Sequence, residues 1–394
     1  MMAQEYRAPD SVGRLQRNAL MAGAIALLVC IFGAIKSPQI FFPSYLMVYL
    51  LVLGLALGSL GLLMLQHLTG GHWGIVIRRP LESATLTLPL LAVLFIPIIF
   101  GMKYLYGAWL DPERVRAEPL SAMQQGYLTA HWFYIRAFLY FVVWIGLMFI
   151  FNRWSREQDV NQADLALRRR FKMLAGPGII LYVFVMTFAA IDWVMSISPH
   201  WASTIYGFLF VAGQLISAMS LMIAVVVLLS HTAPMAGLIQ KRHIHDLGKL
   251  LLAFVMLFAY FDFSQLLIIW SGNQPEEITF YRSRLYGEWG VVAVIVLVFH
   301  FFVPFFLLLS RDLKRNYRLL PKVALWMIFI RLVDLFWMTR PEFTARAIPS
   351  WIDLVVPIAL IGLWLGFFAF NLQKQPLLPL GDPKLAEAIA HHEH

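Results

Sequence analysis

Residues 41–65 read FFPSYLMVYLLVLGLALGSLGLLML, 25 positions without a charged side chain. An apolar stretch of about 20 residues is long enough to cross the hydrocarbon layer of a membrane as a helix. The whole chain shares this composition, since 60% of its 394 residues are hydrophobic and only 13% are charged. Soluble domains usually carry about 25% charged residues. The sequence therefore predicts an all-α, polytopic integral membrane protein and excludes a soluble enzyme, a disulfide scaffold and a disordered chain.

Apolar windows of this kind recur along the chain. About ten are found, at residues 19–35, 41–65, 84–106, 129–151, 172–196, 202–230, 246–270, 288–310, 321–339 and 351–372. No small-residue cleavage site follows the first window, so we expect a retained helix rather than a signal peptide. We expect one transmembrane domain over residues 1–372 and a cytoplasmic tail over residues 373–394.

The basic residues indicate the orientation. With ten spans both termini lie on one side, and the segments on that side, including loops 67–83, 152–172, 231–249 and 311–322, hold 21 Lys and Arg residues. The opposite loops hold eight. Since basic loops are retained in the cytoplasm, we expect both termini there. The net charge of +9 is explained in the same way, and no nucleic-acid partner is expected.

Two polar segments on the basic side invite separate interpretations. Residues 151–171 are rich in arginine, which favours a short helix on the membrane surface facing anionic lipid. The tail ends in His391, His392, Glu393 and His394, where a mobile terminus is the simpler interpretation than a metal site.

Few residues could hold a cofactor. Cys30 is the single cysteine, which excludes an intrachain disulfide, covalent haem attachment through Cys-x-x-Cys-His and a cysteine-ligated iron–sulfur cluster. A membrane haem needs pairs of histidines deep in facing helices, and only His300 falls deep in a window. Phosphate-loop, zinc-protease and nucleophile-elbow motifs are also missing from the sequence. We therefore expect no cofactor bound by this chain.

Ionisable residues inside the windows are the main candidates for chemistry, because a charge at the membrane centre costs about 2.5–3.5 kcal/mol to insert. Arg331 and Asp334 are three residues apart on one helical face, which permits an internal ion pair. Asp262, the strongest functional candidate, lies near Ser264 and Gln265 in YFDFSQLLIIWSGN. With His300 and Asp192 these residues form a candidate proton path: Asp262, Ser264, Gln265, His300, Arg331, Asp334 and Asp192. Burial as neutral or paired groups is the competing interpretation.

A second candidate site lies near the outer surface, on the side of the membrane away from the two termini. His131, Tyr134, Arg136 and Asp192 could form a quinol pocket if their helices are neighbours, with a histidine and a carboxylate to accept the two quinol protons.

Prolines and glycines indicate where helices bend and where they pack closely. Pro304 removes the amide that would bond the carbonyl of His300, so we expect a kink there. Pro97 and Pro357 act likewise on the carbonyls of Val93 and Asp353. Gly54 and Gly58 form a G-x-x-x-G pattern, which is typical of close helix packing in membranes.

Four longer stretches carry a resemblance to a known family. They are IRAFLYFVVWIG (135–146), IDWVMSISPHWASTIYG (191–207), AYFDFSQLLIIWSGNQPEEI (259–278) and VFHFFVPFFLLLSRDLKRN (298–316). Together they resemble the polysulfide-reductase C (NrfD-like) membrane proteins, and among them the F-type subunits of bacterial alternative complex III. The resemblance extends from the first span to the last.

The resemblance implies two four-helix bundles, formed by the second to fifth and the sixth to ninth spans, with the first and tenth beside them. It implies a quinol-oxidising respiratory complex in the bacterial inner membrane. The partners would be a homologous membrane subunit, an iron–sulfur protein and c-type cytochromes, with a cytochrome c or a terminal oxidase as acceptor. The F-type subunit itself resembles a structural partner with a proton path rather than the redox subunit.

Two alternatives remain open from the sequence. One is that this chain binds quinol itself, in the pocket described above. The other is a secondary transporter, although Pro97, Pro304 and Pro357 do not occupy matching positions in two halves, as the interrupted helices of transporters do.

Overall fold

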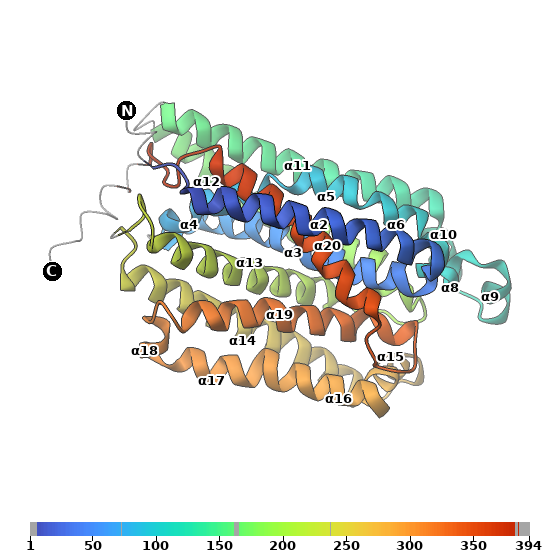
Figure 1. Cartoon of the computed structure of the whole chain (residues 1–394). Helices are drawn as coiled ribbons and strands as arrows, with labels where there is room; N and C mark the ends of the chain where they lie inside the picture. The colour runs from blue at the N-terminus through green and yellow to red at the C-terminus, as the bar shows by residue number, and fades with distance from the viewer. Residues whose placement is uncertain (1–5, 72, 161–164, 237, 383–384, 386–394) are drawn as a thin grey trace.

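The computed structural model describes residues 6–71, 73–160, 165–236, 238–382 and 385, and every regular element in those ranges is helical (Figure 1). The α-helices of the first part are α2 (Asp10–Lys36), α3 (Pro38–Thr69), α4 (Trp73–Thr85), α5 (Leu88–Leu94), α6 (Ile96–Phe100), α7 (Met102–Leu105), α8 (Gly107–Leu110), α9 (Pro112–Ala117), α10 (Ala122–Tyr127), α11 (Ala130–Val160) and α12 (Leu165–Trp193). The remaining elements are η1 (Met195–Ile197), α13 (Tyr206–Ser230), α14 (Lys241–Gly272), α15 (Pro275–Leu285), α16 (Gly287–Val296), η2 (Leu297–Phe302), α17 (Val303–Leu309), α18 (Arg311–Lys314), α19 (Leu320–Thr339), η3 (Arg340–Glu342) and α20 (Trp351–Gln373).

Nine helical segments in the described ranges are long and apolar enough to cross a membrane, and each corresponds to an expected span. The tenth expected span, 321–339, is α19, which is less apolar because it carries Lys322, Arg331 and Asp334. It nevertheless packs against α3, α13 and α16 and runs along the bundle with them (Figure 1). The predicted all-α, polytopic membrane fold is confirmed.

The contacts between helices define two bundles. In the first, α3 packs against α4, α5 and α12, and α11 packs against α5 and α12. In the second, α13 packs against α14 and α19, α14 against α17, and α16 against α19. The bundles join where α3 meets α13, and here a Cβ atom on Gly58 would lie only 2.1 Å from the carbonyl oxygen of Gln214. The close packing predicted from the G-x-x-x-G pattern is therefore confirmed.

Helices α2 and α20 pack against each other beside the first bundle, and α20 also contacts α3 (Figure 1). Their backbones meet at two glycines. A Cβ atom on Gly23 would lie 2.7 Å from the amide nitrogen of Leu363, and one on Gly362 would lie 2.9 Å from the carbonyl oxygen of Ala19. Small residues thus bring the first and last spans together.

The third span differs from its expected bounds. The helical segment runs over Trp73–Phe100, whereas the sequence predicts a span at 84–106 preceded by a loop at 67–83. Arg78 and Arg79 therefore lie in a buried helix instead of a basic loop. The hydropathy pattern misses this because it treats each charge as solvated, although Glu82 lies one turn away and pairs with both arginines.

The predicted surface helix over residues 151–171 is also wrong throughout its described part, since residues 165–171 belong to α12. Residues 151–160 continue α11, and Ser155 and Gln158 on this extension are buried. The tail after α20 folds back onto the protein, where Leu377 and Leu378 are buried and the amide of Leu377 donates to the carbonyl of Tyr6 at 2.8 Å. His391, His392, Glu393 and His394 lie outside the described residues.

Prolines interrupt two of the spans. Pro304 follows a π-helical segment, Leu297–Phe302, which contains His300, so the regular helix is disturbed at the predicted place. In this segment the carbonyl of Phe299 accepts a hydrogen bond from the Trp326 indole of α19 at 3.1 Å. Pro97 lies just after the break between α5 and α6, whereas Pro357 lies inside the continuous helix α20.

Candidate functional site

The centre of the second bundle holds the ion pair predicted from the spacing of Arg331 and Asp334. Both side chains are buried on α19, and the Arg331 guanidinium donates to the Asp334 carboxylate. Gly213 of α13 makes room for the arginine, since a Cβ atom there would lie 2.3 Å from Cζ of Arg331. Gly213 of α13 thus leaves the space that the buried Arg331–Asp334 pair of α19 occupies.

Two aromatic rings complete the surroundings of this guanidinium. The Cζ atom of Arg331 lies 5.8 Å from the ring centre of Phe210 on α13 and 5.3 Å from that of Phe258 on α14. Both distances allow an attraction between the cation and the electron-rich ring face. These contacts stabilise a positive charge at a depth where water would otherwise be needed.

Asp262 of α14 lies close to this pair. Its carboxyl group is half-buried and within electrostatic range of both Asp334 and Arg331. It has no hydrogen-bond or ion-pair partner among the residues that the structure describes. One arginine thus lies within electrostatic range of two carboxylates, of which only Asp334 is bonded to it.

His300 lies on the π-helical segment of the same bundle. Its ring is buried edge-on to Phe258, with 4.6 Å between ring centres, and it lies within electrostatic range of Arg331. Within the described part of the chain, neither ring nitrogen has a hydrogen-bond partner. Its neutral imidazole offers one hydrogen-bond donor and one acceptor.

A line of polar groups leads from this centre toward the end of the bundle where α15 and η3 lie. The buried hydroxyl of Tyr206 is within electrostatic range of Arg331, Asp334, Arg284 and Glu342. Tyr281 is buried as well, and burial raises its pKa, to which the nearby negative charge of Asp262 adds. The two tyrosines therefore lie between the central charges and those at the α15 end.

Arg284 and Glu342 form that outer charge pair. Arg284 is buried, donates to Glu342 at 2.9 Å and also donates to the carbonyls of Phe280 and Met338 at 2.9 and 3.1 Å. Burial lowers the pKa of this guanidinium, and Glu342 opposes the shift. Glu342 is partly exposed and lines a surface cavity of about 400 Å³ together with Phe280, Ser283, Glu118, Arg114 and His200. Ionisable and hydroxyl groups within electrostatic range of one another thus lie between this cavity and the bundle centre.

The other three members of the predicted proton path, Ser264, Gln265 and Asp192, are not part of this central group. Gln265 is buried but accepts a hydrogen bond from Ser203, while Ser264 is half-buried. Asp192 belongs to the first bundle and is bonded to Arg136. The structure therefore brings together Asp262, Arg331, Asp334 and His300 and separates them from Asp192.

The predicted quinol pocket is assembled only in part. Asp192 accepts two hydrogen bonds from Arg136, at 2.8 and 3.0 Å, and a third from Tyr140 at 2.6 Å. The ring of Tyr127 covers the guanidinium, with 3.9 Å from its centre to Cζ. His131 is exposed on the same helix as Arg136 and packs beside Trp132, and Tyr134 lines an apolar groove.

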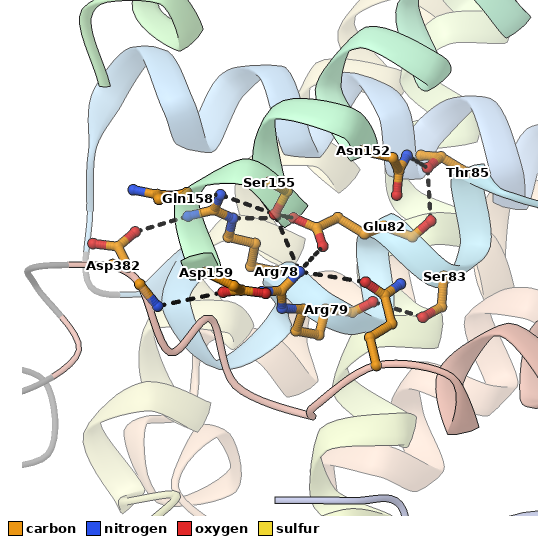
Figure 2. Close-up of polar contacts among 12 residues, drawn as sticks. Arg78, Arg79, Glu82, Ser83, Thr85, Asn152, Ser155, Gln158, Asp159 and Asp382 are labelled. Carbon is orange, nitrogen blue, oxygen red and sulfur yellow. Dashed lines mark hydrogen bonds and ion pairs between the residues drawn. The ribbon is translucent and has the colours of Figure 1, made fainter. Parts of the chain in front are cut away.

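A third polar cluster, absent from the sequence predictions, lies at the opposite end of the first bundle (Figure 2). Arg78 donates to Glu82 at 3.1 Å, to Gln158 at 2.7 Å and to Asp382 of the tail at 2.9 Å. Arg79 donates to Glu82 at 2.7 Å and also to Asp159. The side chains of both arginines are only 1% exposed.

This cluster satisfies its charges internally. Ser155 of α11 donates to Glu82 at 2.5 Å and accepts from both arginines at 3.1 Å. Buried charges are tolerated when each is paired and hydrogen-bonded, as here. The spacing Arg78–Glu82 and Arg79–Glu82 was the available sequence signal, because it places all three side chains on one helical face. Nothing in the sequence connects them with the tail, which is more than 290 residues away.

Comparisons with known proteins add no assignment. The chain matches no protein-family model and no curated protein. In the described part of the chain, no group of three or more His, Cys, Asp or Glu residues is arranged to hold a metal ion.

Proposed function

We propose that this chain is an integral membrane subunit of a quinol-oxidising respiratory complex and that its second bundle conducts protons. The membership of such a complex rests on the resemblance of four sequence stretches to F-type subunits of alternative complex III. The partners would then be a homologous membrane subunit, an iron–sulfur protein and c-type cytochromes. Quinol would be the substrate of the complex as a whole.

One observation carries the proton-conducting role. Asp262 is a carboxyl group without a partner in the described chain, beside a buried Arg331–Asp334 pair and within reach of polar groups that lead to a surface cavity. The positive charge of Arg331 offsets the negative charge of either carboxylate. With one arginine and two carboxylates, the cluster is neutral while one carboxyl group holds a proton, so each proton that Asp262 releases has to be replaced by another for the charge to stay balanced.

The direction of conduction follows from where the polar groups lie. Glu342, Arg284, Tyr206 and Tyr281 connect the centre with the α15 end. Toward the α18 end, the residues that pack around α14 and α17 include the buried Leu251, Val255 and Leu308. Protons would therefore exchange between Asp262 and the surface at the α15 end.

The test is a substitution in the intact complex. Asp262→Asn keeps the size of the side chain and removes the titratable proton, whereas Glu277→Gln makes the same charge change on a partly exposed residue of α15. The proposal expects fewer protons released per quinol oxidised, or slower turnover, in Asp262→Asn and normal values in Glu277→Gln. Unchanged stoichiometry and turnover in Asp262→Asn would refute the proton role.

Membership of the complex needs a separate test. A tagged chain purified from native membranes should bring with it subunits that carry c-type haem and iron–sulfur clusters, which an optical spectrum and mass spectrometry would identify. A chain that purifies alone and moves a solute in vesicles would instead favour a secondary transporter.

A second candidate, quinol binding by this chain, is favoured by one groove in the first bundle. The groove has a volume of about 620 Å³ between α5, α6 and α11, and Tyr134 and Phe141 are among its lining residues. It could hold an apolar ring or tail near the bonded pair Arg136–Asp192. Binding of a quinone analogue in this groove, and its loss in Tyr134→Ala, would support quinol binding by this chain. Mutations that confer resistance to the analogue and map only to other subunits would contradict it.

A further inference from the structure

A groove with a strongly basic edge lies between the two bundles at the α18 end. Its volume is about 730 Å³, and its lining includes Trp73 at the start of α4 and Arg242, Asp246, Lys249, Leu250 and Ala253 on α14. Because α4 belongs to the first bundle and α14 to the second, the groove is formed by both.

Two further cations lie at and after α18, which packs against the same helix α14, close to Lys249 of the groove lining. Lys314 of α18 is only 7% exposed, its stem lies against Gly248, and it has no acidic partner among the described residues. A Cβ atom on Gly248 would lie 2.9 Å from Cγ of Lys314. Arg315 follows, and its Nε is buried without a hydrogen-bond partner in the described part of the chain.

These cations lie near one another. Burial lowers the pKa of Lys314, and the positive charge of Lys249 lowers it further. His245, one turn before Lys249, is within electrostatic range of Lys249, Lys314 and Arg315. The only carboxylate among them is Asp246, which pairs with Lys249 at 2.7 Å.

The charges therefore do not balance. Arg242, Lys249, Lys314 and Arg315 contribute four positive charges and Asp246 contributes one negative charge, which leaves these five residues, of the groove lining and of the α18 segment beside α14, with a net charge of +3. Like charges held close together repel, and a buried amine or guanidinium without a partner is costly. An anion at this position would supply the missing partner.

The walls of the groove identify the kind of anion. Leu250, Ala253 and Leu257 follow one another on a single face of α14, running from the basic edge toward the middle of the span, and Leu257 is exposed. Trp73 lines the groove, and tryptophan is enriched at membrane–water interfaces. A ligand with a phosphate head and an apolar tail matches both parts.

We propose that this groove binds an anionic phospholipid, with its phosphate beside Lys249, Lys314 and Arg315 and an acyl chain along Leu250, Ala253 and Leu257. The lipid would contact both bundles and hold them together at this end. A free phosphate ion shares the head-group chemistry but would leave the apolar wall unused.

The experiment compares two triple variants of the full chain purified in detergent. Lys249→Gln/Lys314→Gln/Arg315→Gln removes three charges at the groove, and Arg168→Gln/Arg169→Gln/Arg170→Gln removes three exposed charges of α12 at the same end of the protein. Phosphatidylglycerol, phosphatidylcholine and inorganic phosphate are the three probes. Bound lipid is counted by native mass spectrometry, and affinity is measured from the shift in thermal unfolding.

We expect phosphatidylglycerol to bind and stabilise the wild-type chain and the α12 variant, and to bind the groove variant at least about tenfold more weakly, since each cation near a membrane surface contributes about 1 kcal/mol. Equal weakening in both variants would show general charge attraction and overturn the proposal. Equal stabilisation by phosphate alone, or by phosphatidylcholine, would overturn it as well.

Two double variants keep the proposal testable if the triple variant misfolds. Arg242→Gln/Lys249→Gln changes two exposed residues of the groove, and Arg168→Gln/Arg169→Gln is its control. Weaker binding confined to the groove pair supports the proposal, whereas identical affinities in the two pairs contradict it.

Discussion

Replacing Asp334 by Asn should destabilise the protein strongly, because it leaves Arg331 charged and buried. Two unit charges about 4 Å apart interact with about 4 kcal/mol at the effective dielectric constant that suits protein sites. Removing one partner of a buried pair typically costs about 3–5 kcal/mol. Asp262 lies within electrostatic range of Arg331 and can partly replace the lost carboxylate, so we expect a loss near the lower limit, about 3 kcal/mol.

The same reasoning predicts that the two carboxylates are coupled. In the background of Asp334→Asn, Asp262→Asn removes the last nearby negative charge and should cost about 1–2 kcal/mol more than it does in the wild-type chain. The assay is equilibrium unfolding in mixed micelles of four purified proteins: the wild-type chain, the two single variants and the double variant. Arg331→Met/Asp334→Leu, which removes the pair as a unit, should be more stable than Asp334→Asn. A loss below about 1 kcal/mol for Asp334→Asn, or additive effects, would refute the reasoning.

Three further predictions use the same unfolding assay. Gly58→Ala should lower the free energy of unfolding by about 1–3 kcal/mol, because the added Cβ would overlap the Gln214 carbonyl. Gly146→Ala, where a Cβ would have nothing within 4 Å, should be neutral or slightly stabilising, and equal effects of the two would contradict the close contact of α3 and α13. Glu82→Gln should lower the free energy of unfolding by about 3–5 kcal/mol, because Arg78 and Arg79 lose the carboxylate that they share. Asp382→Asn should cost less, since the side chain of Asp382 is 14% exposed, and the reverse order would be incompatible with Glu82 as the centre of the cluster. Tyr140→Phe should cost about 0.5–1.5 kcal/mol through the lost hydrogen bond to Asp192, and an unchanged stability would argue against that bond.

The fold was predictable from the sequence because its main determinant is local. Uninterrupted apolar stretches such as 41–65 specify transmembrane helices whatever lies around them. The ion pair of Arg331 and Asp334 was predictable for the same reason, since helical spacing alone brings the two side chains to one face. The close contact at Gly58 followed from the spacing of small residues.

The site was predictable only in part because its remaining contacts join distant segments. Tyr206, Arg284 and Glu342 lie on α13, α15 and η3, and nothing in their spacing connects them with Asp262. Arg78 and Arg79 were mistaken for loop residues because a hydropathy window cannot register that Glu82, Asp159 and Asp382 neutralise them. The hydropathy pattern places both Asp192 and Asp262 in spans but does not show that the two spans belong to different bundles.

The most direct measurement of the central claim is infrared difference spectroscopy of the intact complex during quinol-driven turnover. If Asp262 takes up and releases a proton, a carboxyl C=O band should change on turnover, shift in heavy water, vanish in Asp262→Asn and persist in Glu277→Gln. A spectrum that is identical in the wild-type complex and in Asp262→Asn would show that Asp262 keeps one protonation state throughout and would contradict proton conduction through this bundle.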